Sequence, residues 1–162
     1  DYVAHDDSVL GLAWSWGARP KIFASCSQDE TVRVWHRERE QPMWIFEGHT
    51  SAVFTVAWGP EAQCREDPMG RLFSSGHDAT VRIWDTEVGV CLAKLKTDHA
   101  SWVTAVTIKP DGMHMGTSSM HERTSLLLYD VVPPVPTTED FKQVLVAKSE
   151  VLSERLEPVL EL

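Results

Sequence analysis

The sequence predicts an all-β protein with a C-terminal α-helical tail, in which three four-stranded antiparallel units follow one another along the chain. Two observations lead to this prediction. Three segments with a His near their start align without a gap: AHDDSVLGLAW at 4–14, GHTSAVFTVAW at 48–58 and DHASWVTAVTI at 98–108. Short runs that alternate apolar and polar residues follow, bounded by turn residues, and such runs are typical of strands.

The first unit covers about residues 4–47 and contains four strand-like runs. VLGLAW ends at Trp14, FASCS begins at Phe23, TVRVW ends at Trp35, and PMWIF spans 42–46. Turn residues such as Gln and Asp separate the second run from the third. This order predicts a four-stranded antiparallel meander.

The second unit covers about residues 48–97 and repeats the order with VFTVAW, LFSSG, TVRIW and VCLAKL. The polar segment GPEAQCREDPMGR lies between its first two runs, and we expect an exposed loop there. The third unit covers about residues 98–130 and is degenerate. Tyr129 stands where Trp is expected, and Arg123 stands where Asp is expected.

The chain changes character after residue 130. Residues 131–137, VVPPVPT, are rich in Pro and are expected to form an extended linker. Residues 138–162 are expected to form a helix, because apolar residues can share one helical face and Pro158 would end it. The helix either packs on this protein or binds a partner.

Units of roughly 44 to 50 residues with four strands each have the size of one β-propeller blade. Their motifs are a Gly-His pair at 48–49, a turn at Asp78 and a Trp-Asp pair at 84–85. With these motifs the chain resembles the WD-repeat (WD40) β-propeller family over residues 4–130. The resemblance implies that residues 1–130 form WD-repeat blades of a larger propeller.

The resemblance also implies a hydrogen-bonded structural tetrad in each complete unit. In it, the Trp indole donates to the Ser hydroxyl, the hydroxyl donates to the His ring, and the other ring nitrogen donates to the Asp. A fully satisfied buried network of this kind fixes how strands and turn sit together. The tetrads would be His5, Ser25, Asp29 and Trp35 in the first unit, and His49, Ser74, Asp78 and Trp84 in the second.

Ser74, His49 and Asp78 are also the side-chain types of a hydrolase triad. Three features argue against catalysis. The set recurs in the first unit, which an active site does not need. A Trp completes it as a buried donor, and the GxSxG nucleophile elbow is absent. We therefore expect no catalytic residues and no enzyme activity.

In the WD-repeat family, positions beside the start of the first strand and at the Asp turn reach a partner-binding rim. Phe54 and Trp102 are the strongest candidates, because aromatic anchors dominate interface energies. The alternative for Trp102 is packing between blades, and for Gln28 and His77 it is a solvated turn. The rim residues implied by the resemblance are Ser8, Leu10, Gln28, Ala52, Phe54, His77, Trp102 and Thr104.

Composition limits the partners that we expect. The net charge is −9 and no basic stretch is uninterrupted, so nucleic acid is not expected. Cys26, Cys64 and Cys91 lack CxxC spacing, and neither a disulfide, a metal site nor a cofactor is expected. No apolar run is long enough for a membrane span. A reducing location, cytoplasmic or nuclear, fits best.

Three blades would form an open arc with exposed faces. We expect blades outside residues 1–162 to complete it, with a second copy or another subunit as the alternative. The expected function is a non-enzymatic WD-repeat interaction scaffold that mediates protein–protein contacts within a larger complex. One alternative is a substrate receptor of a ubiquitin ligase; some such receptors carry Arg where this chain has Glu38 and Glu87. The other is a propeller-fold enzyme.

Overall fold

A computed structural model describes residues 5–15, 21–59, 71–110, 112–120 and 126–131 of the chain. This part contains strands and no helix, as the all-β prediction requires. The first sheet has the order β1-β2-β3-β4. Its strands are β1 (Val9–Trp14), β2 (Ile22–Ser27), β3 (Val32–His36) and β4 (Trp44–Phe46).

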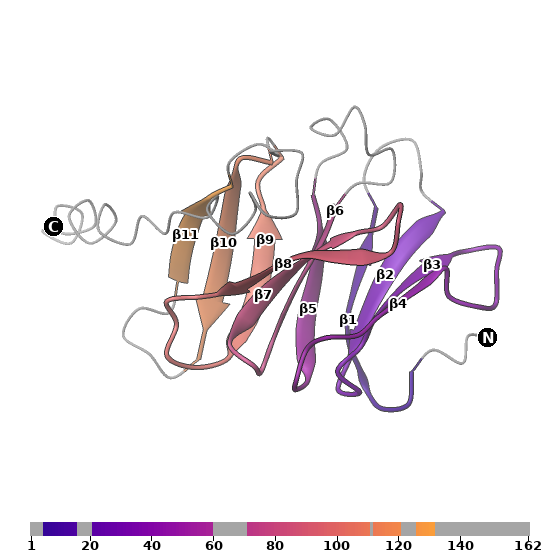
Figure 1. Ribbon diagram of the computed structural model, residues 1–162, viewed down its shortest axis with the longest axis horizontal. Helices are drawn as coiled ribbons and strands as arrows, with labels where there is room; N and C mark the ends of the chain where they lie inside the picture. The colour runs from indigo at the N-terminus through magenta and orange to yellow at the C-terminus, as the bar shows by residue number, and fades with distance from the viewer. Residues whose placement is uncertain (1–4, 16–20, 60–70, 111, 121–125, 132–162) are drawn as a thin grey trace, which may run out of the picture.

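The second sheet repeats this meander with the order β5-β6-β7-β8, and the third has the order β11-β10-β9. Figure 1 shows the three sheets side by side in chain order, from the purple first sheet to the orange third sheet. Their strands are β5 (Val53–Trp58), β6 (Arg71–Gly76), β7 (Thr80–Asp85), β8 (Val90–Lys96), β9 (Val103–Ile108), β10 (His114–Ser119) and β11 (Leu126–Asp130).

The third sheet has three strands within the described residues, whereas the sequence led us to expect four. The expected linker beyond residue 131 and the expected helix at 138–162 lie outside the described residues, as does most of the expected exposed loop, 60–70. No helix in the part of the chain that the structure describes could cross a membrane.

The register of the strands repeats from sheet to sheet. Trp35 lies on β3 opposite Phe23, and Trp84 lies on β7 opposite Leu72, so both tryptophans occupy third strands as predicted. The β1–β2 pairing shifts register near Gly11, and the β5–β6 pairing shifts at the equivalent place near Thr55. The repeat therefore extends to details of the backbone.

The apolar core fills the two spaces between neighbouring sheets. One buried cluster joins the first sheet to the second, and another joins the second to the third. Gly11 lets β1 approach β5, since a Cβ there would lie 3.1 Å from the Phe54 carbonyl oxygen. The Trp58 indole donates to the Ala13 carbonyl at 3.0 Å, and the Trp44 indole donates to the Thr86 carbonyl at 2.8 Å. These bonds fix neighbouring sheets face to face.

Candidate functional site

In the second sheet, four polar side chains from the loop before β5, from β6, from the β6–β7 turn and from β7 meet in one chain of hydrogen bonds. The Trp84 indole donates to Ser74 Oγ at 2.8 Å, and Ser74 Oγ lies 2.8 Å from His49 Nε2. His49 Nδ1 lies 2.9 Å from Asp78 Oδ2. A carboxylate only accepts, so Nδ1 donates to Asp78 and the Ser74 hydroxyl donates to Nε2.

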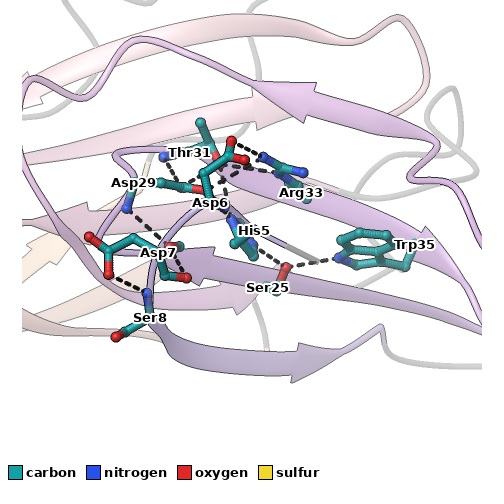
Figure 2. A network of polar contacts seen from close by, with 10 residues as sticks. His5, Asp6, Asp7, Ser8, Ser25, Asp29, Thr31, Arg33 and Trp35 are labelled. Carbon is teal, nitrogen blue, oxygen red and sulfur yellow. Dashed lines mark hydrogen bonds and ion pairs between the residues drawn. The ribbon is translucent and has the colours of Figure 1, made fainter. Parts of the chain in front are cut away.

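The first sheet contains the same chain of bonds (Figure 2). The Trp35 indole donates to Ser25 Oγ at 2.8 Å, His5 Nε2 lies 2.7 Å from that oxygen, and His5 Nδ1 lies 2.8 Å from Asp29 Oδ2. Thr31 adds a hydroxyl donor to Asp29 Oδ1 at 2.6 Å. The two sets of four therefore have matching partners and matching distances.

Local backbone structure places each Asp. Asp78 precedes Ala79 in the turn between β6 and β7, and Asp29 precedes Glu30 in the equivalent turn, where Ala79 and Glu30 both have positive φ, 58° and 69°. The Asp78 carboxylate also accepts the backbone N–H of Thr80 at 3.2 Å. Asp favours such turns because its side chain binds the backbone two residues on.

Burial and hydrogen bonding perturb the charged members of each tetrad. Burial lowers the pKa of His5, although the nearby Asp29 acts in the opposite direction. Burial raises the pKa of Asp29, but bonds donated by Thr31 outweigh it and hold this pKa well below its ordinary value. Burial likewise raises the pKa of Asp78, and the bond from His49 helps to bring it well below its ordinary value. Both carboxylates are thus acceptors at neutral pH.

The third sheet carries a shortened version of the tetrad that the sequence did not reveal. His99 Nε2 lies 3.0 Å from Thr117 Oγ1, and the Tyr129 hydroxyl accepts the Asp98 N–H at 3.3 Å. Met115 lies opposite Tyr129, and Thr117 is two residues further along β10, so Thr117 takes the position of the Ser. More residues separate Thr117 from Tyr129 than separate the Ser from the Trp in the other two copies, so the sequence alignment did not show that Thr117 corresponds to the Ser.

The tetrad in the second sheet is closed to solvent. Ser74 has an exposed fraction of 0%, and the side chains of His49 and Asp78 are 0% and 4% exposed. The Ser74 hydroxyl is held between the Trp84 indole and the His49 ring. A nucleophile needs an open face toward its substrate, and this hydroxyl does not present one.

Three of the expected rim residues, Phe54, His77 and Trp102 of the second and third sheets, form an aromatic cluster. The His77 and Trp102 ring centroids are 4.0 Å apart in an edge-to-face arrangement. The Phe54 ring lies 6.1 Å from His77 and 6.3 Å from Trp102. His77 Nδ1 is 3.1 Å from Ser51 Oγ, and this contact helps to orient the imidazole within the cluster of three rings. Trp102 remains 38% exposed, so the cluster reaches the surface.

The other rim residues lie at equivalent positions but do not all touch this cluster. The Gln28 N–H donates to the Ser8 carbonyl at 2.9 Å, and the His77 N–H donates to the Ala52 carbonyl at 2.9 Å. Thr104 Oγ1 lies 3.1 Å from Ser118 Oγ, within the third sheet. Leu10, on β1, is 41% exposed.

The described residues contain no group of three or more His, Cys, Asp or Glu side chains arranged to hold a metal ion. Cys26 is buried and Cys91 exposed, and both are free thiols. Burial raises the pKa of the Cys26 thiol to about 12. Cys26 is therefore an apolar core residue in this fold.

Comparison with protein families gives one match. The family described as "WD domain, G-beta repeat" matches residues 1–36 and 40–85, which together are about half of the chain. The two matched segments coincide with the strands β1–β3 and β4–β7. The first segment ends at β3 and the second at β7, the strands that contain Trp35 and Trp84.

Several curated proteins are similar to this chain. "Nuclear distribution protein PAC1" of Gibberella zeae is 32% identical over 105 residues, which are 64% of this chain and 23% of that protein. "THO complex subunit 3" of Arabidopsis thaliana is 26% identical, over 78% of this chain and 38% of that protein. "Cell division cycle 20.6, cofactor of APC complex", also of Arabidopsis thaliana, is 32% identical over 59% of this chain and 22% of that protein. The chain thus spans between about a fifth and two fifths of the length of these relatives.

Proposed function

The chain belongs to the WD-repeat family, and on that basis we propose that it is a non-enzymatic interaction scaffold that binds other proteins within a larger complex. The observation that supports the proposal most is the partly exposed aromatic cluster of Phe54, His77 and Trp102, to which two neighbouring sheets contribute. Aromatic side chains that are partly exposed and held rigidly are the usual anchors of protein interfaces. The names of two relatives place those proteins in complexes.

A short peptide is the partner that suits this rim. Trp102 and Phe54 offer apolar walls, and the exposed Gln28 and Ser8 offer amide and hydroxyl groups beside the first sheet. His77 lies next to both rings, and its Nδ1 is within 3.1 Å of Ser51 Oγ, so the side chains of the cluster are held in place before a partner binds. Pre-organised side chains lose little entropy on binding.

The alternatives have less support. The Ser74 hydroxyl is buried, which argues against a hydrolase. The presence of an equivalent tetrad in the first sheet also argues against a hydrolase. A substrate receptor of a ubiquitin ligase is disfavoured by Glu38 and Glu87, which stand where some receptors of that kind carry Arg. The acidic net charge of −9 disfavours nucleic acid as a partner.

We further propose that additional blades extend the arc of three sheets, and that the protein works in a reducing compartment, the cytoplasm or the nucleus. Exposed apolar residues on both end sheets support additional blades. The free thiols of Cys26 and Cys91 support a reducing compartment. The names of relatives, such as "Nuclear distribution protein PAC1", agree with an intracellular role for those proteins.

The rim is tested by identifying a partner and then measuring its affinity for three variants. A partner captured by the immobilised chain is purified, and its binding is measured by calorimetry. We expect Phe54→Ala and Trp102→Ala each to weaken binding by about 2 kcal/mol or more. Val88→Ala is the matched control, because Val88 is an exposed apolar residue in the β7–β8 turn.

The thermal transition of each variant is recorded in parallel. Trp102 is partly exposed, so Trp102→Ala is expected to change the stability of the fold little. If both rim variants bind as tightly as the unmodified chain while Val88→Ala weakens binding, the interaction surface is at the outer turns and the rim proposal is wrong.

A further inference from the structure

A buried arginine lies beside an exposed thiol in the second sheet. Arg82, on β7, is only 9% exposed, and its Nε–H is buried without a hydrogen-bond acceptor among the residues that the structure describes. Cys91, on β8, is exposed and is a free thiol. Arg82 Nη1 donates to Cys91 Sγ at 3.7 Å. Burying a positive charge is costly unless an anion pairs with it.

The equivalent arginine in the first sheet has carboxylate partners. Arg33 lies on β3 opposite the tetrad Ser of its sheet, as Arg82 does on β7. Arg33 Nη2 lies 3.3 Å from Asp6 Oδ2 and 3.5 Å from Asp29 Oδ2. An arginine at this position of the repeat is therefore neutralised by acidic side chains when these are available.

The second sheet lacks the counterpart of Asp6. Asp6 directly follows the tetrad His of the first sheet, and Thr50 directly follows the tetrad His of the second. The backbone is alike at the two places, since the Asp6 N–H donates to Asp29 at 3.0 Å and the Thr50 N–H donates to Asp78 at 3.3 Å. The change from Asp to Thr thus removes a carboxylate from the surroundings of Arg82.

Arg82 contacts uncharged groups instead. Its Nη2 donates to the Gly48 carbonyl, and its Nη1 donates to Cys91 Sγ. The described part of the chain offers this guanidinium no ion pair with a carboxylate. The Cys91 S–H donates to the Ala93 carbonyl at 3.5 Å, which leaves the sulfur lone pairs to accept from Arg82. The guanidinium is therefore held against an atom that oxidation can convert into part of an anion.

The exposure of Cys91 does not depend on where the chain begins or ends. β8 is the outer strand of the second sheet and pairs with β7. The first and third sheets both pack against the second. Cys91 lies opposite Trp84, which belongs to the cluster shared with the first sheet. Small oxidants therefore reach the Cys91 sulfur while both neighbouring sheets are in place.

We propose that Cys91 is a site of reversible oxidation, at which hydrogen peroxide converts the thiol into a sulfenic acid that Arg82 holds. The sulfur attacks one peroxide oxygen, so that an S–O bond forms and the O–O bond breaks. The sulfur loses two electrons and the peroxide gains them, and the thiol proton joins the departing hydroxide as water. Arg82 stabilises the negative charge of the ionised sulfenic acid and gains the anionic acceptor that its surroundings otherwise lack.

Thiols reverse the oxidation, which suits the reducing compartment proposed above. A small thiol attacks the sulfenic sulfur of Cys91, an S–S bond forms, the S–O bond breaks and water leaves. A second small thiol attacks the mixed disulfide and releases Cys91 as a thiol. This cycle uses none of the residues of the aromatic cluster, so its failure leaves the peptide-binding proposal standing.

The test treats the folded chain with hydrogen peroxide, traps sulfenic acid with dimedone and locates the label by mass spectrometry of peptides. Cys26 is the internal control, because it is fully buried and burial raises the pKa of its thiol to about 12. The label should form at Cys91 about tenfold faster than at Cys26 or more, and dithiothreitol added before dimedone should prevent it. Exposure alone would give this difference, so Arg82 is tested separately.

Thr50→Asp separates the effect of charge from that of exposure. The new carboxylate takes the place that Asp6 has in the first sheet and competes with Cys91 for Arg82. Labelling of Cys91 should slow several-fold in Thr50→Asp and stay unchanged in Thr50→Asn, the uncharged matched control. Arg82→Gln should slow it as well, because the positive charge is gone. Thr50 is exposed, so its two variants keep the test valid if Arg82→Gln does not fold.

Two results would overturn the proposal. The first is a Cys91 that is labelled no faster than Cys26 in the unmodified chain. The second is equal labelling of Cys91 in Thr50→Asp and Thr50→Asn, because the thiol would then react without help from the Arg82 charge. Urea midpoints recorded for each variant show that the rates compare folded chains.

Discussion

Replacing Ser74 with Ala removes one oxygen atom from a position that has no exposed surface. That oxygen accepts the Trp84 indole N–H at 2.8 Å and lies 2.8 Å from His49 Nε2. Both partners are buried, with Trp84 1% exposed and His49 5% exposed, so water cannot readily replace the hydroxyl. The substitution therefore leaves one buried donor and one buried acceptor without a partner.

Each buried polar group left unpaired costs about 1–3 kcal/mol, and the change of side-chain volume is small. For Ser74→Ala we expect a loss of about 2 kcal/mol or more in the free energy of unfolding. Ser75 provides a matched control on the same strand. It is also fully buried, but its hydroxyl makes one bond, to the Val103 carbonyl at 3.2 Å, so Ser75→Ala should cost about 1 kcal/mol.

Urea denaturation followed by tryptophan fluorescence measures both costs from the shift in midpoint at constant slope. We expect Ser74→Ala to be clearly less stable than Ser75→Ala. Equal midpoints would show that the Ser74 hydroxyl contributes no more than an ordinary side-chain hydrogen bond. A hydrolase activity that disappears in Ser74→Ala without any change in midpoint would show that the tetrad is catalytic.

Two further predictions concern the stability of the fold at acidic pH and the role of Gly48, the residue before His49. The folded-state pKa values of Asp29, Asp78 and His5 all lie below their ordinary values, so the stability they contribute is present above the unfolded pKa and is lost as the pH falls. The urea midpoint should therefore decrease as the pH falls below about 6.5, and more steeply below about pH 5. In Asp78→Asn the decrease below about pH 5 should be smaller. A midpoint that rises on acidification would contradict this expectation. Gly48 has φ +147°, and a Cβ there would lie 2.7 Å from Arg82 Nη1. Gly48→Ala should therefore lower the free energy of unfolding by more than about 1 kcal/mol in the same assay. An unchanged midpoint would show that the backbone relaxes.

The sequence predicted the parts of the fold that repeat. Trp35 and Trp84 could be placed on third strands because each follows a Ser and an Asp at the same spacing. The alternation of apolar residues in VFTVAW predicted strand β5 correctly up to its last residue, Trp58. Local periodicity and the repeat agree in these segments, and each supports the other.

Contacts between sheets could not be predicted, because they depend on surfaces that only the fold brings together. The bonds from Trp44 to Thr86 and from Trp58 to Ala13 join residues far apart in sequence, and no local pattern signals them. The role of Thr117 was hidden by the longer connection to β11, which moved it out of the alignment. The strand register, which the sequence does not contain, reveals the match.

Trp84, Ser74, His49 and Asp78 form one structural network in the second sheet. The most direct test is a double-mutant cycle of Trp84→Phe and His49→Ala, measured by urea denaturation. Both side chains bind the same Ser74 oxygen, so we expect that the two losses are not additive and that their coupling is about 0.5–3 kcal/mol. Losses that add to within about 0.3–0.5 kcal/mol would show that the two residues act independently, and would contradict the claim.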